Sequence, residues 1–383
     1  MARFQKSLLW EQALPAEDQL KINNNNLGIA LSIKGDHEAA LEFFDERTRR
    51  LEGRLKPDQE IALLNGRSYV CLQSGRFEEA ITFLKKAMQL AEQSGALHPF
   101  SSIMGNLITA LIKESRYAES LPLLQKILAF QERLGNHRDV AYNLLRQGSV
   151  YLTLGMGEKA KSCFQNGRSY LDESDKNLFL WYVLVDGYWE KEYGDQNRAM
   201  ELFREMEQGA ETYSIPEIQS WAVYAQADLA FEQKKHAECR ALLTKVHATT
   251  QDKEFLARLH LLEAKIAAFE KGEDPEKLFA MVENECVTGH YREILWELYH
   301  DWGLSREKRQ GPKAAIPLLE QGAHIVEAIV GSLPEEYRDR YLNQKMRKKL
   351  FQDLEHSRTV PIGGMASRIK GFFKEKLNRS SGH

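Results

Sequence analysis

Residues that could carry out catalysis or bind metals are scattered along this 383-residue sequence and form no motif. The eleven histidines lack HExxH or any other metal-ligand spacing. The stretch LGMGEKAKS at 154–162 lacks the spacing of a phosphate-binding loop, and no GxSxG nucleophile elbow is present. No CxxC or Cys/His pattern links the cysteines, which we expect to be free thiols in helix cores: Cys71, Cys163, Cys239 and Cys286. We therefore predict a non-enzymatic chain that needs no cofactor and no metal.

The composition is typical of a soluble folded protein, with 43% hydrophobic and 28% charged residues. A formal net charge of −3 leaves no basic surface of the kind that binds nucleic acid. The first residues do not resemble a signal peptide, and the most apolar run, FLWYVLV at 179–185, is too short to cross a bilayer. We expect a cytoplasmic protein.

A period of 38 to 40 residues organises the chain. In each period one position, usually a small residue, is followed four residues later by an aromatic residue, leucine or methionine. These pairs are Ala40 with Phe44, Ala80 with Leu84, Ser120 with Leu124, Ala160 with Phe164, Ala199 with Phe203, Cys239 with Leu243, Lys277 with Met281, and Ala315 with Leu319.

Each period is typical of two helices joined by a tight turn. Turns such as KGD at 34–36 contain a glycine, which suits the positive φ at which many helices end. A second small residue, such as Gly28 or Gly148, lies twelve positions before the first and would let the helices approach closely. Such a hairpin cannot bury its apolar face alone, so neighbouring hairpins must stack into a solenoid.

Two stretches, LGIALSIKGDHEAALEFF at 27–44 and GSVYLTLGMGEKAKSCF at 148–164, resemble the tetratricopeptide repeat. The resemblance covers residues 21–330 as about eight units and implies an all-α, right-handed superhelix. Units seven and eight depart from it, with Lys265 and Lys277 where small residues belong. The period exceeds the common one of about 34 residues, as in bacterial regulator-type versions of the repeat.

The remaining segments flank this array. Residues 1–20 are predicted to form a lead-in helix. Pro334, Glu335 and Glu336 suit a helix start, so residues 333–357 are predicted to form a C-terminal capping helix. Residues 358–383 form a basic tail, with six Lys/Arg and one Glu.

The resemblance implies that a partner binds on the concave face, which the first helix of each hairpin lines. Positions of this sequence that match the ligand-contacting positions of peptide-binding relatives are Asn25, Asn26, Asn65, Tyr69, Asn106, Lys113, Tyr142, Arg146, Trp181, Tyr188, Trp221 and Tyr224. The asparagine amides could hold a peptide backbone, although the run NNNN at 23–26 also suits a helix cap. The aromatic residues could anchor an amphipathic helix, and core packing is the alternative.

The tail contains an apolar face typical of a short helix: Met365, Ile369, Phe372, Phe373 and Leu377. Three interpretations remain open for it. The first is a flexible end, and the second is a membrane-surface helix. The third is a helix that docks through residues 365–379 into a groove of this or another chain. Its ligand face would consist of Ile369, Phe372, Phe373 and Leu377. Gly363 and Gly364 also resemble a join to a fused partner peptide.

These observations predict a scaffold or adaptor that binds a protein or peptide in its concave groove. Bacterial relatives with this build act in signalling and polarity control, and some bind small GTPases, which the resemblance adds as candidate partners. The alternative is a regulatory domain of a larger signalling protein that senses a peptide or small molecule.

Overall fold

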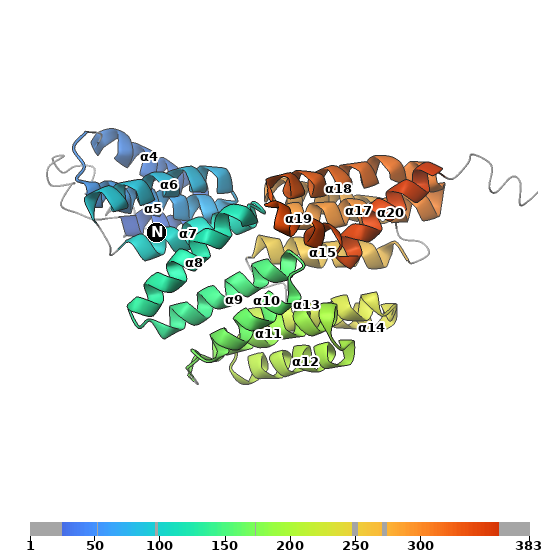
Figure 1. Ribbon diagram of the computed structural model, residues 1–383. Coiled ribbons are helices and arrows are strands. Elements are labelled where there is room, and N and C mark those ends of the chain that lie inside the picture. Colours follow the sequence, from blue (N-terminus) through green and yellow to red (C-terminus); the bar gives the residue numbers. More distant parts are fainter. Residues whose placement is uncertain are drawn as a thin grey trace, which may run out of the picture.

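The computed structural model describes residues 25–51, 53–95, 99–172, 174–246, 252–269 and 274–359. Within these ranges every regular element is a helix and no strand occurs. Eight successive helix pairs are followed by two C-terminal helices, so the predicted all-α solenoid is confirmed (Figure 1). No described helix is long and apolar enough to cross a membrane.

The eight pairs correspond to the eight predicted units. They are α3 (Asn25–Ile33) and α4 (His37–Leu51); α5 (Pro57–Ser74) and α6 (Phe77–Ser94); α7 (Phe100–Lys113) and α8 (Tyr117–Arg133); α9 (His137–Thr153) and α10 (Gly157–Arg168); α11 (Lys176–Tyr193) and α12 (Gln196–Thr212); α13 (Pro216–Glu232) and α14 (His236–Leu243); α15 (Lys253–Ala267) and α16 (Glu276–Thr288); and α17 (Arg292–Gln310) and α18 (Pro312–Ser332). Two further helices follow, α19 (Glu335–Leu342) and α20 (Lys345–Thr359).

Size complementarity between the two helices of a hairpin explains the repeat pattern. A Cβ atom added to Gly148 would lie 2.3 Å from the ring of Phe164, sixteen residues later, which is fully buried. Gly28 stands in the same relation to Phe44, and Gly187 to Phe203, each at 2.4 Å. In these units the phenyl ring therefore occupies the space that a missing side chain leaves.

The helix ends follow the local chemistry of the sequence. Asp175 accepts a hydrogen bond from the backbone N–H of Leu178 at 3.1 Å, and Asp252 accepts one from Glu254 at 3.0 Å, so both carboxylates cap helix starts. In the turn between α5 and α6, Gly75 has a φ of 81°, which only glycine adopts without strain.

The predicted register of unit seven is wrong. Lys277 and Met281 were aligned with core positions, but both are exposed, Met281 by 40%. The face of α16 that packs inward instead carries Phe279, Val282 and Cys286, each fully buried. The helix is rotated relative to the expected alignment because these apolar side chains bury more apolar surface than a lysine and a methionine could.

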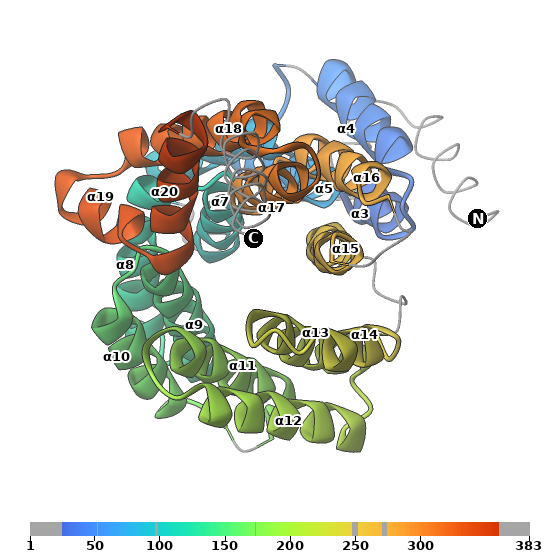
Figure 2. The same cartoon turned by 90° about the vertical axis from the view of Figure 1, so that its right-hand side faces the viewer.

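The solenoid completes about one superhelical turn, so that its last units lie beside its first. In Figure 1 units one to three and units seven to eight form two neighbouring groups, joined by units four to six below them. Figure 2 shows α9, α11 and α13 facing the centre, with α10 and α12 outside. A hydrogen bond joins the two groups directly, from the Tyr117 hydroxyl of α8 to Glu293 of α17 at 2.9 Å. The C-terminal segment also bonds to unit four: Gln344 Nε2 donates to the carbonyl of Leu152 at 2.8 Å, and Arg347 Nη1 to that of Thr153 at 3.0 Å.

The segment predicted as a cap covers the last hairpin, as two helices. α20 packs on α18 with Leu350 and Leu354 buried. α19 is short, and its Tyr341 is fully buried, while Gly155 lies so close to the carbonyl of Arg340 that an added Cβ would be 2.6 Å from its oxygen. This segment therefore also contacts unit four and helps to close the turn.

The Gly–Phe contact yields a first prediction. Gly148→Ala should lower the midpoint of thermal unfolding and reduce the free energy of unfolding by about 1–3 kcal/mol. The reason is that the packed core leaves the Phe164 ring no space to move away from the added methyl group. Gly105→Ala, in α7, meets nothing within 4 Å and should instead stabilise by about 0.5–1 kcal/mol through its helix propensity. Circular dichroism melts of both variants would test this. Equal effects would contradict the packing argument.

Candidate ligand-binding cavity

A cavity of about 570 Å³ lies at the centre of the superhelix. Its size is within the range of roughly 300–1,000 Å³ typical of ligand pockets. Its wall comes mainly from the inner faces of α7, α9, α11, α15 and α17 and from the start of α20, with Tyr117 of α8 and Glu232 of α13. It therefore exists only because units seven and eight return to units three and four.

The lining combines charged, polar and apolar side chains. It comprises Thr109, Ile112, Lys113, Ser115, Tyr117, Tyr142, Leu145, Arg146, Ser149, Val150, Leu152, Thr153, Tyr188, Lys191, Glu192, Glu232, Glu254, Arg258, Tyr291, Arg292, Glu293, Ile294, Trp296, Glu297, Gln344, Met346 and Arg347.

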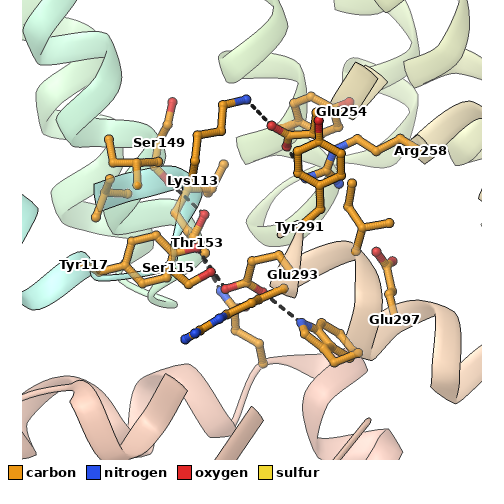
Figure 3. Close-up of a pocket in the computed structure, with 18 of the residues that line it drawn as sticks. Lys113, Ser115, Tyr117, Ser149, Thr153, Glu254, Arg258, Tyr291, Glu293 and Glu297 are labelled. Carbon is orange, nitrogen blue, oxygen red and sulfur yellow. Dashed lines mark hydrogen bonds and ion pairs between the residues drawn. The ribbon is translucent and has the colours of Figure 1, made fainter. Parts of the chain in front are cut away.

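An ion-paired carboxylate bridges the two groups of units across the cavity (Figure 3). Glu254 of α15 accepts a hydrogen bond from Lys113 of α7 and another from Arg258 at 3.1 Å. Burial opposes the charge of Glu254, but Lys113 and Arg258 lower its pKa to about 2. The pair joins residues 141 positions apart in sequence.

A second carboxylate, that of Glu293 on α17, collects donors from several helices. The phenols of Tyr117 and Tyr341 each donate to it at 2.9 Å, and the indole of Trp296 at 2.8 Å. Arg347 of α20 donates at 2.9 Å. Burial acts against ionisation, yet Arg347 leads the groups that hold the pKa of Glu293 below its ordinary value. This arrangement fixes α17 and α20 against α8.

Lys191 of α11 is paired in the same way with the next unit. Its ammonium lies 2.5 Å from Asp228 and 2.7 Å from Glu232, both on α13. Burial would lower the pKa of Lys191, but the two carboxylates raise it. The charge on this wall is therefore held in place and neutralised.

Two partly buried charges in the wall lack such neutralisation. Arg146 of α9 donates only to neutral groups, at 2.9 Å to the Thr109 hydroxyl and 3.3 Å to the Gly105 carbonyl. Burial lowers its pKa. Glu297 of α17 makes no ion pair or hydrogen bond with the described residues, and burial raises its pKa.

Four of the twelve predicted partner-binding residues line this cavity: Lys113, Tyr142, Arg146 and Tyr188. The predicted asparagines lie elsewhere. Asn106 donates to the side chain of Asn65 at 3.1 Å, and Asn65 to Ser102 at 3.3 Å, so they form a ladder between units two and three. Asn25 and Asn26 begin α3, and Tyr69 is half-buried on α5; none of these lines the cavity.

The predicted aromatic residues form a cluster beside the cavity. The rings of Trp181 and Trp221 are 6.1 Å apart, and Trp221 lies 4.8 Å from Phe255 and 6.0 Å from Tyr224. Tyr224 is buried, whereas Trp181 and Trp221 are half-buried. These residues thus pack units five to seven together, and a role in partner binding stays a prediction.

The tail ligand face (Ile369, Phe372, Phe373 and Leu377) and the lead-in segment 1–20 lie outside the described residues. Within the described ranges no group of three His, Cys, Asp or Glu is placed to hold a metal ion. All four cysteines are buried and free, and burial raises the pKa of the Cys71 thiol to about 12.

Sequence reasoning missed the half of the cavity that units seven and eight and α20 contribute. Glu254, Arg258, Glu293 and Glu297 project from α15 and α17, whose repeat pattern is weakest. The sequence did contain a signal for this part of the cavity. All four ionisable residues lie on the first helix of a repeat, which is the helix expected to form the inner face.

Comparison with known proteins agrees with this architecture. Residues 18–93 match the family model described as tetratricopeptide repeat. No curated protein sequence matches the chain. The apo form of the quorum sensor NprR from B. thuringiensis aligns with a TM-score of 0.57 at 17% identity, over 87% of this chain and 93% of that one.

NprR in complex with its cognate peptide NprX aligns slightly better, with a TM-score of 0.61 at 18% identity, over 87% of this chain and 94% of that one. Likeness at such identities establishes the fold. Residues 18–93 therefore resemble the tetratricopeptide repeat in sequence, and the described ranges share the helical solenoid fold of these proteins.

The bridge at Glu254 yields a second prediction. Glu254→Gln should destabilise the protein by about 3 kcal/mol at pH 7, because Lys113 and Arg258 lose their carboxylate. The folded-state pKa of Glu254 lies below its ordinary value of 4.5, so its contribution is complete above pH 4.5 and is lost as the pH falls toward about 2.

Urea unfolding of wild type and variant at several pH values would measure the difference. It should shrink below pH 4.5. Glu92→Gln serves as a control, because its pair with Lys126 is about half exposed and should contribute less than about 1 kcal/mol. A difference that is independent of pH would contradict the assignment.

Proposed function

We propose that the chain binds a short peptide in the central cavity and acts as a non-enzymatic regulatory or scaffold protein. The observation that carries this proposal is the cavity itself: a ligand-sized space on the inner faces of the first helices, walled by units three to eight and by α20. The peptide complex of NprR, a protein of the same fold, supports the choice of a peptide.

The cavity favours the sensor over the open scaffold, the two functions that the sequence left in competition. Its walls include α7 and α9 on one side and α15, α17 and α20 on the other. A ligand that contacts both sides binds only the closed superhelix, so by mass action it would stabilise the closed state. Such coupling would let the outer surface report whether the peptide is bound.

A partner protein on the solenoid surface is the second candidate. Trp181 and Trp221 are half-buried neighbours on α11 and α13, and aromatic residues of this kind serve as interface anchors. A signalling regulator or a small GTPase remains within this candidate, as does docking of the tail segment 365–379. Cytoplasmic location suits both candidates.

Filling the cavity should abolish peptide binding. Ser149 lines it on α9, where its hydroxyl donates to the carbonyl of Leu145 at 2.9 Å. Ser149→Trp would place an indole in the ligand space, and we expect at least a tenfold loss of affinity. The measurement is retention of short random-sequence peptides by the full chain in ultrafiltration, read by mass spectrometry.

Thr82→Trp is the matched control. Its hydroxyl makes the same bond to its own helix, to Glu78 at 3.0 Å, but it is exposed on the outer helix α6. It should leave peptide retention unchanged. Retention of no peptide by wild type, or equal retention by the Ser149 variant with an unchanged circular dichroism spectrum, would refute the proposal.

A further inference from the structure

Most charged side chains of the cavity wall form ion pairs. Two partly buried ones among the described residues do not, and they indicate what the cavity could bind. The pairs are Lys113 and Arg258 with Glu254, Lys191 with Glu232, Arg347 with Glu293, and Arg292 with Glu114. Glu192 is exposed. Among the described lining residues, Arg146 and Glu297 are the partly buried charges with no oppositely charged partner within 4.0 Å.

Arg146 is positioned but not neutralised. Its guanidinium donates to the Thr109 hydroxyl, the Gly105 carbonyl and, at 3.4 Å, the Asn143 side chain. No carboxylate contributes to the shift of its pKa, which burial lowers and the Tyr142 phenol opposes. A guanidinium has five N–H donors in a planar fork that suits a carboxylate, so an anionic ligand group would complete this arrangement.

Within the described part of the chain, Glu297 is an unpaired carboxylate on a different wall of the cavity, formed by α17. Figure 3 shows Glu297 of α17 and Ser149 of α9, one turn after Arg146, on opposite sides of the cavity, and no dashed line reaches the Glu297 carboxylate. Burial raises its pKa and nearby Asp301 and Asp228 add to this, while Lys265 and Arg258 lower it from beyond contact distance. A cationic ligand group in contact would offset the cost of this unpaired carboxylate.

We infer that the cavity selects a dipolar peptide, whose carboxylate binds Arg146 on α9 and whose basic group binds Glu297 on α17. This inference rests on the proposed function and specifies its ligand. The two charges set the direction of the peptide across the cavity. The hydroxyls of Ser149 and Thr153 also line the cavity; both donate to carbonyls of their own helix, so their oxygens can accept hydrogen bonds from a peptide backbone. The Tyr188 hydroxyl on the lining can both donate and accept.

Matched peptide libraries on the full chain test the inference. One random library has free termini, a second is amidated at the C-terminus, and a third lacks Asp and Glu. A fourth is acetylated at the N-terminus, and a fifth lacks Lys and Arg. The second and third distinguish a terminal from a side-chain carboxylate at Arg146, and the fourth and fifth distinguish a terminal amine from a basic side chain at Glu297.

Two substitutions provide the decisive comparison. Arg146→Gln should reduce binding of carboxylate-bearing peptides by about ten- to one-hundredfold and leave peptides without that carboxylate unchanged. Glu297→Gln should reduce binding of peptides that carry the basic group by a similar factor and leave peptides without it unchanged. Arg49→Gln and Glu201→Gln, both on exposed side chains, are the charge-matched controls and should have no effect.

The outcomes separate the inference from the function on which it rests. If wild type retains peptides but neither substitution changes which peptides are retained, the inference is overturned and the proposed function stands. If wild type retains no more peptide than the Ser149→Trp variant, the proposed function fails and the inference with it. The inference is confirmed if Arg146→Gln weakens only peptides that carry the carboxylate and Glu297→Gln weakens only peptides that carry the basic group.

Discussion

The carboxylate of Glu293 lies where unit three meets unit eight and the C-terminal helices, and the cavity depends on it. A carboxylate taken out of water needs hydrogen-bond donors in place of the lost solvent. Tyr117 on α8, Tyr341 on α19 and Arg347 on α20 supply them, together with Trp296 of α17 itself. Because these donors come from separate units, satisfying one buried charge forces those units together. A repeat array otherwise held only by contacts between neighbours thereby gains a long-range closure.

Closure changes what the inner surface can recognise. An open solenoid offers a groove that a long partner can enter anywhere, whereas a ring that includes α15 and α17 encloses a space of limited size. The more buried charges of this space, such as Glu254 and Glu293, lose solvent and need ion pairs or hydrogen bonds in its place. The wall matches most of its own charges, as at Glu254, and these pairs contribute shape and rigidity more than affinity. Selectivity then falls to the two charges that the fold leaves unmatched, Arg146 and Glu297.

The parts that depend on local pattern were predictable from sequence. The Gly148–Phe164 contact follows from a spacing of sixteen residues within one hairpin, and the resemblance to the tetratricopeptide repeat implies that Tyr142 and Arg146 lie on the inner face. The closure was not predictable in this way. It depends on the small rotation between successive hairpins, accumulated from unit three to units seven and eight, and no single motif encodes that sum. In α16 the core contains Phe279 where Lys277 was expected. The repeat pattern is weak in this helix and did not identify the side that packs inward.

The same geometry bears on why an asparagine ladder lies in the first units while the ligand space lies deeper. Asn65 and Asn106 use their amides on each other, since a buried or half-buried amide without a partner is unfavourable. Their ladder therefore holds α5 and α7 in register. Arg146, one unit further on, has only hydroxyl and carbonyl partners, because no carboxylate among the described residues of units three to five reaches it. Units two and three thus use their inner polar groups for structure, and unit four is the first to present a charge that the chain itself does not satisfy.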